Sequence, residues 1–508
     1  MSNSIILKNS FILYIRLLVT SILGIITARV LLDSLGVEDF GLYAVVSGVV
    51  MMISLLNTVL ISTSFRFIAF ELGKGQDGDV NKIFNISLAL HLSMAVILLL
   101  LAETVGIYYI ENYLKVAVGR MDAAIFVFRL SVYAAIFAII SIPFQALITA
   151  KENFKIRALI EIVTATAKLV AAYFLLSYSG DRLLFYAILI LCATVLGPIA
   201  FTVYCKINYK KFTYFKISKD WKVYKEFFSF SSWIMFGAGA SVGKVQGTAL
   251  IINAFFGTAL NASFGLANQL NTFVLMFAQN VGQAAVPQIT KSYSAGNIER
   301  TKTLTAVISK FSFFLMLIPA IPILFQTEFI LKLWLKELPE YLIVFSQLMV
   351  INALIDSSVS GLPAAIQATG KIKIFQIILS SNLLLALPIS YLFFYFNFPP
   401  QTILFVFIAV SLVNNIIAQF FLKLTIGFDI KDYFKRVYLG IIGVGILVSP
   451  MYFLVDWFKK DLLSLLLFSM ISTGWVIITI YIVGLTVNEK LEVKEIILKT
   501  KRRFKSNV

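Results

Sequence analysis

Apolar segments of about twenty residues follow one another along almost the whole chain, starting with 10–32. A helix of that length crosses the roughly 30 Å hydrocarbon core of a bilayer. Hydrophobic residues make up 59% of the sequence and charged residues only 14%, far outside the range of soluble domains. A lipid-embedded backbone must satisfy its hydrogen bonds within each segment, so we predict an all-α polytopic membrane protein. The first segment contains Arg16 and is not followed by a small-residue cleavage site, so we expect a retained span rather than a signal peptide.

Hydropathy, together with the Gly, Pro and charged residues that separate the apolar segments, predicts about fourteen transmembrane helices. Their approximate limits are 10–32, 40–64, 84–105, 122–149, 157–178, 183–205, 227–255, 260–287, 303–325, 340–369, 374–396, 401–422, 437–456 and 462–486. With a cytoplasmic N-terminus, the inside segments carry 30 Lys and Arg residues, the outside loops 7 and the spans 6. Because cytoplasmic loops are enriched in Lys and Arg, this split predicts that both termini are cytoplasmic. The same enrichment explains the net charge of +17 without a nucleic-acid partner.

Two short motifs recur in the second half of the chain. Phe40-Gly-Leu42 returns as Phe264-Gly-Leu266, 224 residues later, and the stretch 143–151 resembles 363–371, 220 residues later. Two matches at nearly one offset indicate an internal duplication. An offset of six spans gives both copies the same orientation, which predicts two parallel six-helix lobes around a central cavity, plus two extra C-terminal helices. The repeated Pro143 and Pro363 predict bends near the cytoplasmic ends of spans 4 and 10.

The predicted organisation has five parts. These are an N-lobe over 1–205, a basic cytoplasmic linker over 206–226, a C-lobe over 227–425, spans 13 and 14 over 426–486, and a basic cytoplasmic tail over 487–508. The linker holds seven lysines interleaved with aromatic residues, a pattern that fits either nucleic acid or an anionic membrane surface. We interpret it as a segment lying on the inner leaflet, since it directly follows a span.

Charged side chains inside the spans are the first candidates for function, because a charge in hydrocarbon needs a partner or a wet cavity. The cations are Arg16, Arg29, Arg129, Lys168, Lys244 and Lys310, whereas the clear intramembrane acids are only Glu161 and Asp356. A positive excess suits an anionic cargo such as a pyrophosphate, which arginine binds with two parallel hydrogen bonds. The alternatives are that Arg16 and Arg29 extend to an interface and that Lys168 pairs with Glu161. We expect Lys310 to extend to the inner interface.

Polar uncharged residues form a stripe along span 8. Asn268, Thr272, Gln279 and Gln283 fall on one helix face. Such a stripe binds sugar hydroxyls if it lines a cavity, or joins helices if it does not. Asp356, in the middle of span 10, is the first candidate for carrying a coupling H⁺ or Na⁺, with Glu161 the second. The alternative for Asp356 is a salt bridge to a cavity cation.

A longer motif after the first span resembles a known family. It reads Arg-x-Leu-Leu-x-x-Leu-Gly-x-x-x-Phe-Gly-Leu-Tyr over 29–43, and Pro143 and the 151–157 loop add to the likeness. With the two-lobe architecture, the chain resembles the polysaccharide-transporter branch of the multidrug/oligosaccharidyl-lipid/polysaccharide exporter superfamily, and within it the Wzx-type O-antigen and capsule flippases. The resemblance implies a V-shaped transporter of the bacterial inner membrane. Such proteins move undecaprenyl-pyrophosphate-linked oligosaccharides outward by alternating access, coupled to an ion gradient.

Three other functions are alternatives for this sequence. They are a lipid II flippase, a cation-coupled multidrug exporter of the same fold, and a membrane polysaccharide polymerase or glycosyltransferase. The scarcity of intramembrane acids disfavours the exporter. The sequence has no nucleotide-binding loop, no metal-ligand spacing and no nucleophile–base arrangement, which disfavours an enzyme. We expect no cofactor beyond the coupling ion. The expected partners are a lipid-linked oligosaccharide, membrane lipids, a polysaccharide polymerase and a chain-length regulator, but not nucleic acid.

Overall fold

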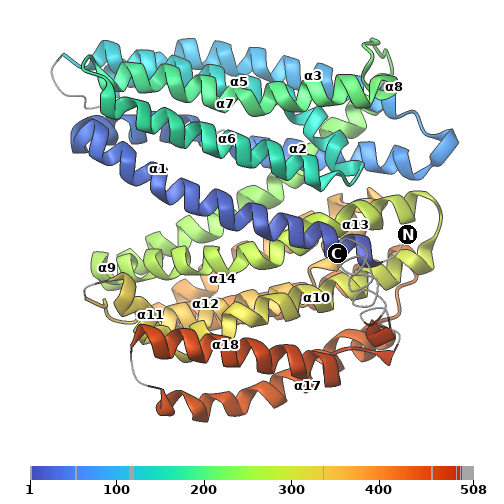
Figure 1. Cartoon of the computed structure of the whole chain (residues 1–508). Helices are drawn as coiled ribbons and strands as arrows, with labels where there is room; N and C mark the ends of the chain where they lie inside the picture. The colour runs from blue at the N-terminus through green and yellow to red at the C-terminus, as the bar shows by residue number, and fades with distance from the viewer. Residues whose placement is uncertain are drawn as a thin grey trace, which may run out of the picture. The chain divides into compact units, whose positions relative to one another are not determined.

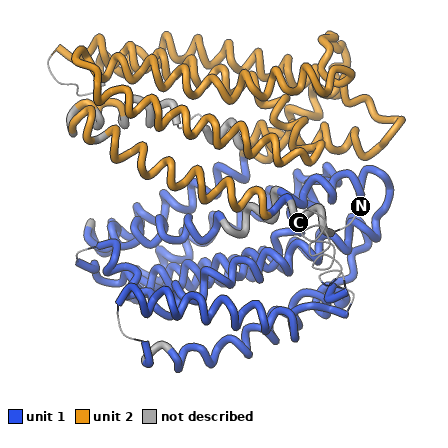
Figure 2. Tube along the Cα trace, viewed as in Figure 1, with its two compact units in different colours: residues 1–10, 236–508 blue, residues 11–235 orange. Residues whose placement is uncertain are grey.

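The computed structural model describes residues 3–51, 54–113, 119–335, 337–458, 461–487, 489–491 and 494, and its regular elements are helices (Figure 1). The chain folds into two compact units (Figure 2). The N-terminal unit comprises Phe11–Met235, and the C-terminal unit comprises Met1–Ser10 and Phe236–Val508. The packing boundary therefore falls at 235/236. Most of the predicted basic tail, and Gln279 and Gln283 of the polar stripe, lie outside the residues whose side chains are described.

The N-terminal unit is built around one central helix. Its elements are α1 (Asn3–Met51, from 11 on), α2 (Ser54–Gly73), α3 (Val80–Leu101), α4 (Ile107–Tyr113), α5 (Met121–Ala150), α6 (Phe154–Phe174), α7 (Arg182–Asn208), the short α8 (Lys210–Thr213) and α9 (Trp221–Ser294, up to 235). A five-residue π-helix, Ala102–Gly106, joins α3 to α4. Helix α5 packs against α2, α3 and α7. Its buried side chains include Val127, Phe128 and Leu147, so this helix carries much of the unit's core.

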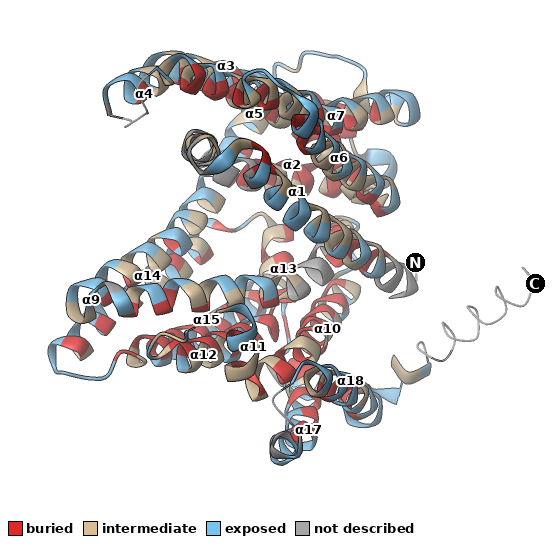
Figure 3. Ribbon diagram, turned by 60° about the vertical axis from the view of Figure 1, so that its left-hand side comes forward, coloured by how far each residue is buried: buried red, intermediate tan, exposed pale blue. Residues whose placement is uncertain are grey.

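The C-terminal unit has its own central helix, α10 (Ile298–Phe325), which packs against α12, α13 and α18. Its other elements are α9 (Trp221–Ser294, from 236 on), α11 (Thr327–Trp334), α12 (Leu342–Ser357), α13 (Gly361–Thr369), α14 (Lys373–Tyr395), α15 (Thr402–Ile426), α16 (Ile430–Tyr433), α17 (Leu439–Val448) and α18 (Leu462–Thr479). In Figure 3, buried residues are frequent along α10, whereas α17 and α18 each combine buried residues with an exposed face. An apolar exposed face is what a lipid-facing helix requires.

Ten of the described helices are long and apolar enough to cross a membrane, or eleven if the bent pair of α12 and α13 counts as one span. The protein is therefore a multi-pass helical membrane protein. The count of fourteen spans stays a prediction, because none of the candidate spans among the described residues corresponds to predicted spans 2, 7 and 8.

The internal duplication is visible in the backbone. Residues with positive φ recur at nearly one offset: Gly36 and Gly257 are 221 residues apart, Gly75 and Gly296 221, Gly119 and Tyr341 222, and Glu152 and Gly370 218. Gly36 has φ 75° and ψ 174°, and Gly257 has φ 83° and ψ −177°, so both long helices break in the same way. Only glycine adopts this region without strain, which explains glycine at both turns.

Asp39, three residues after Gly36, belongs to an ion-pair cluster of the N-terminal unit. Arg120, just before α5, forms ion pairs with both Asp39 and Asp181. Asp181 also caps α7 by accepting hydrogen bonds from the N–H groups of Leu183 and Leu184. Partial burial alone would raise the pKa of Asp181, but these N–H donors and the Arg120 guanidinium outweigh it and hold the pKa below its ordinary value. The motif over 29–43 therefore has a structural role in this unit, since its Asp39 pairs with Arg120.

A buried ion pair joins α10 to the segment after α18. Lys310 is 1% exposed, and its Nζ lies 2.5 Å from Oε2 of Glu489. The same carboxylate oxygen accepts hydrogen bonds from the backbone N–H and the hydroxyl of Thr486. The prediction that Lys310 extends to the inner interface stays a prediction. The structure adds that a carboxylate 179 residues away in sequence is its charge partner.

Candidate transport site

Span 10 is broken in the middle of the C-terminal unit. Helix α12 ends at Ser357 and α13 begins at Gly361, with a bend of 46° between them. The corresponding α5 in the N-terminal unit continues through Pro143 without a break. The bends predicted from the paired prolines therefore differ between the lobes, since only span 10 is interrupted, at 358–360, shortly before Pro363.

Side chains from neighbouring helices satisfy the backbone groups that this break exposes. The Ser309 hydroxyl of α10 accepts a hydrogen bond from the Gly361 N–H at 3.0 Å. The Tyr433 hydroxyl donates to the Ser358 carbonyl at 3.0 Å, and the Asn415 amide donates to the Ile355 carbonyl at 3.4 Å. A Cβ on Gly361 would lie 2.2 Å from the carbonyl oxygen of Thr305, so the close packing of α13 on α10 requires glycine. Broken helices of this kind occur in transporters where non-helical backbone lines a cavity or a binding site.

Asp356 lies at the end of α12, directly before the break. Its carboxylate accepts a hydrogen bond from the Asn352 amide at 3.2 Å, and the Ser411 hydroxyl of α15 is a second hydrogen-bonding neighbour. The residue is exposed at the surface of its helix rather than packed in the core. An accessible carboxylate with two polar neutral partners can accept a proton or coordinate a small cation.

Lys244 of α9 lies in the same part of the C-terminal unit. Its Nζ is 3.8 Å from the centroid of the Phe407 ring of α15. Lys244 and Asp356 interact electrostatically, but the Lys244 nitrogen lies more than 4.0 Å from the Asp356 carboxylate oxygens, so they do not form a direct salt bridge. The structure thus brings together two residues singled out from the sequence, and α15 supplies the intervening aromatic and hydroxyl groups.

The N-terminal unit contains a second ionic cluster, on one face of α6. Glu161 accepts hydrogen bonds from Arg16 of α1 at 2.5 Å and from Arg157, one turn earlier in α6, at 2.9 Å. Arg157 also donates to the Thr149 hydroxyl at 3.2 Å. Arg157 is not among the site residues predicted from the sequence, although its i, i+4 spacing to Glu161 is a recognisable helix-pair signal.

The other predicted cations have different surroundings. Lys168 is partly buried, eleven residues after Arg157 and on the same face of α6, whereas Arg29 is exposed on α1. Neither has an ion pair with the part of the chain that the structure describes. Arg129 is bound through two nitrogens to the Glu103 carboxylate at 2.9–3.1 Å, with its side chain 46% exposed. Glu103 therefore already neutralises the charge of Arg129 within this unit.

Two of the four residues of the predicted polar stripe, Asn268 and Thr272, have described side chains. Asn268 is partly buried in α9. Thr272 is exposed, and its hydroxyl donates a hydrogen bond to the backbone carbonyl of Asn268 at 2.9 Å. Thr272 thus satisfies its hydroxyl within its own helix, which is a common arrangement for threonine in a membrane helix. The stripe as a whole stays a prediction.

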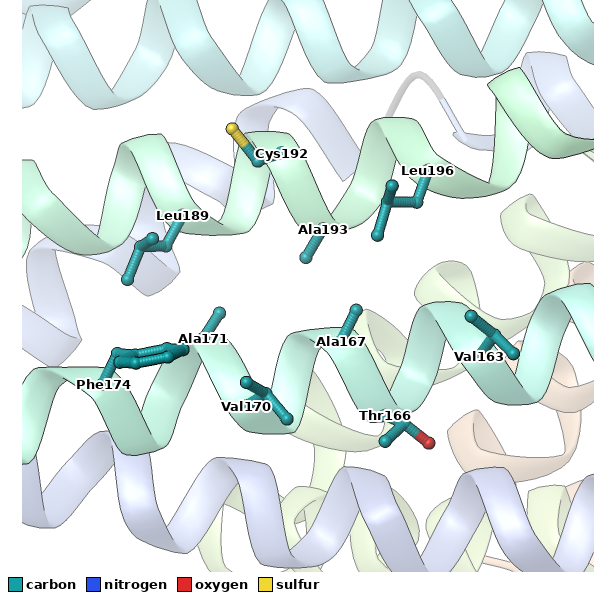
Figure 4. Close-up of a pocket in the computed structure, with 10 residues that line it drawn as sticks. All are labelled: Val163, Thr166, Ala167, Val170, Ala171, Phe174, Leu189, Cys192, Ala193 and Leu196. Carbon is teal, nitrogen blue, oxygen red and sulfur yellow. The ribbon is translucent and has the colours of Figure 1, made fainter.

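An apolar groove of about 490 Å³ runs between α6 and α7 (Figure 4). Its walls include Val163, Val170 and Phe174 of α6 and Leu189 and Leu196 of α7. Ala167, Ala171 and Ala193 are also in the lining, together with Thr166 and Cys192. Val163 and Val170 point away from the face of α6 that carries Arg157, Glu161 and Lys168. Helix α6 therefore presents an ionic face and an apolar groove on different sides.

Comparisons with solved structures define the class of protein. A multidrug and toxin extrusion (MATE) transporter in its bent conformation matches with a TM-score of 0.72 at 14% identity, covering 83% of this chain and 95% of its own. A transporter of the multidrug/oligosaccharidyl-lipid/polysaccharide (MOP) superfamily from Pyrococcus furiosus, described as having a binding pocket of reverse polarity, matches at 0.70 and 13%, with the same coverage. An outward-facing multidrug-resistance transporter of the superfamily matches at 0.70 and 15%, again over 83% and 95%. The chain therefore has the MATE-type fold of this transporter superfamily.

The family follows from the sequence itself. Residues 6–293, more than half of the chain, match the model of the polysaccharide biosynthesis protein family, so the chain belongs to that family. The resemblance inferred from the motif over 29–43 is confirmed at the level of the family and of the superfamily. A comparison with curated protein sequences returned no significant match. The family and the fold are those of membrane transporters.

Proposed function

We propose that this protein is a flippase that moves undecaprenyl-pyrophosphate-linked oligosaccharides across the bacterial inner membrane by alternating access. Membership of the polysaccharide biosynthesis family is the observation that carries this proposal. The transporter fold supports movement of a cargo rather than its synthesis. The oligosaccharide is a repeat unit of an O-antigen, a capsule or an exopolysaccharide.

The ionic face of α6 is the proposed contact for the pyrophosphate. Arg16, Arg157 and Lys168 outnumber Glu161 on this face, so the cluster is cationic. Glu161 holds the two arginines in place, and Lys168 is the cation that no described acid neutralises. Lys168 could donate a charge-assisted hydrogen bond to a phosphate oxygen, which would contribute about 1.5–3 kcal/mol.

The apolar groove between α6 and α7 is the proposed contact for part of the polyprenyl chain. Inside a bilayer, the hydrophobic effect does not drive a polyprenyl chain into an apolar groove, because the lipid tails are equally apolar. Binding there depends on how closely the chain packs against the walls of the groove. The ionic face on the other side of α6 would hold the headgroup of the same amphiphilic lipid. Helix α6 would thus contact both the headgroup and the polyprenyl chain of one cargo lipid.

Asp356 is the proposed coupling residue. Its exposed carboxylate, its two neutral hydrogen-bonding partners and the break of span 10 beside it support a site for H⁺ or Na⁺. Occupation of Asp356 would change its electrostatic interaction with Lys244 of α9. Through that interaction, binding of the ion would favour one packing of α9, α12 and α15 over another.

A headgroup-translocation assay in proteoliposomes tests the proposal. The substrate is a fluorescent polyprenyl-pyrophosphoryl oligosaccharide, and the readout is protection of the fluorophore from an external quencher. Lys168→Ala should lower the initial rate about tenfold through loss of one charge-assisted hydrogen bond. Asp356→Asn should keep exchange in both directions but lose accumulation driven by an H⁺ or Na⁺ gradient.

Lys332→Gln is the matched control. Lys332 is an exposed cation of α11 that pairs with Glu328 at 2.5 Å, so its loss should leave translocation unchanged. Wild-type protein that ignores the oligosaccharide lipid but exports a cationic dye would replace the proposal with a multidrug exporter. Preferential translocation of lipid II would replace it with the peptidoglycan precursor.

A further inference from the structure

The segment between α7 and α9 is folded onto the N-terminal unit. We call residues 209–220 the strap; it contains the short α8. Two buried asparagines of α3 bind its backbone. Asn81 donates to the carbonyls of Phe212 and Tyr214 at 3.1 and 2.9 Å, and Asn85 donates to the Tyr214 carbonyl at 3.0 Å. Asn85 also accepts a hydrogen bond from the N–H of residue 216 at 3.1 Å.

Both ends of the strap have further contacts. Asn153, the N-cap of α6, donates to the Tyr209 hydroxyl at 3.4 Å. Asp220, at the other end, pairs with Lys82 of α3 at 2.7 Å. Between them, the Nζ of Lys151 lies 4.5 Å from the Phe212 ring centroid. These contacts fix which side of the strap faces the protein.

The outward side combines positive charge with large apolar side chains. All seven lysines of 206–225 are exposed, and the one acid of that stretch, Asp220, is already paired. The exposed apolar and aromatic residues are Tyr214 (54%), Phe215 (72%), Ile217 (73%) and Trp221 (81%). Because the asparagine contacts hold the backbone, these side chains cannot turn into the core.

We propose that the strap docks on the anionic phospholipid headgroups of the bilayer in which the protein is embedded. The strap directly follows α7, a candidate span that ends at Asn208, so its position at a membrane surface is continuous with that helix. Lysines are attracted to an anionic surface, and aromatic and aliphatic side chains beside them insert at headgroup level. This surface is separate from the proposed cargo site and does not depend on which lipid is transported.

A fluorescence-quenching measurement on the full chain tests the proposal. A bimane label at Ile217→Cys, in a Cys192→Ala background, reports the position of the strap, since the remaining Cys205 is buried. The protein is placed in bilayers with a nitroxide on the headgroup, either zwitterionic or with anionic phosphatidylglycerol. Quenching should be about twofold stronger in the anionic bilayer and should weaken as salt rises from about 0.1 M to about 1 M.

Three variants distinguish the effect of the lysine charges from the effect of the strap's backbone conformation. Replacing Lys210, Lys211, Lys216 and Lys219 by glutamine should abolish the difference between the bilayers, whereas arginine at the same four positions should preserve it. Asn81→Ala with Asn85→Ala should weaken quenching in both bilayers by releasing the backbone. Equal quenching in both bilayers for the wild type, without salt dependence, would overturn the proposal. A label response to short RNA but not to anionic lipid would overturn it in favour of nucleic acid.

Discussion

Neutralising Glu489 provides a direct test of the buried ion pair with Lys310. The side chains of Lys310 and Glu489 are 2% and 13% exposed, so water cannot replace a lost partner. Removing one member of a buried pair costs about 3–5 kcal/mol, because the other charge stays buried and uncompensated. Glu489→Gln keeps an oxygen that can accept the hydrogen bonds of Thr486, so the substitution isolates the charge. We therefore expect Glu489→Gln to lower the free energy of unfolding by about 3 kcal/mol.

The double variant Lys310→Met with Glu489→Gln distinguishes the pair from its neighbours. Replacing both charges should restore most of the stability, since a buried pair contributes little net free energy against an apolar pair of similar volume. The measurement is equilibrium unfolding in mild detergent, followed by tryptophan fluorescence. Glu328→Gln, which breaks the exposed pair with Lys332, is the control and should cost less than about 1 kcal/mol.

Two results would refute the reasoning about this pair. Glu489→Gln could be no less stable than the Glu328→Gln control, which would mean that Lys310 is not charged in the native state or finds another acceptor. Alternatively, the double variant could be as unstable as Glu489→Gln alone, which would show that the loss comes from packing rather than from an unpaired charge.

Three further predictions concern the local structure. Gly36→Ala or Gly257→Ala should each lower the free energy of unfolding by about 1–3 kcal/mol in the same assay, because φ near +80° with extended ψ strains any other residue; Gly24→Ala, in a helical position, should not. Because the pKa of Asp181 is held below its ordinary value, this group stabilises the fold above about pH 4 and the contribution is lost as the pH falls. Asp181→Asn should thus flatten the acid limb of a stability–pH curve, and an unchanged limb would contradict this. Ser309→Ala should cost about 1–3 kcal/mol by leaving the Gly361 N–H unsatisfied, and a neutral result would mean that water takes the place of the hydroxyl.

The sequence by itself determined the class of protein, the duplication and the family. Span length, the Lys and Arg distribution and the motif over 29–43 are properties of short stretches, so they can be read without knowing which helices touch. The positive φ at Gly36 is also a local property, because that backbone conformation restricts the residue type directly. For this reason the repeat found from two short motifs reappears in four pairs of positive-φ residues.

The tertiary structure alone decided which charges are paired and where span 10 breaks. Arg16 and Glu161 are 145 residues apart in sequence, and Lys310 and Glu489 are 179 apart, so no local pattern could pair them. Pro143 and Pro363 are equivalent in sequence, yet only span 10 is interrupted, where α10, α15 and α16 supply partners for the freed backbone groups. A charge or an unwound turn is tolerated in a membrane protein only where another helix satisfies it, and that condition is set by packing.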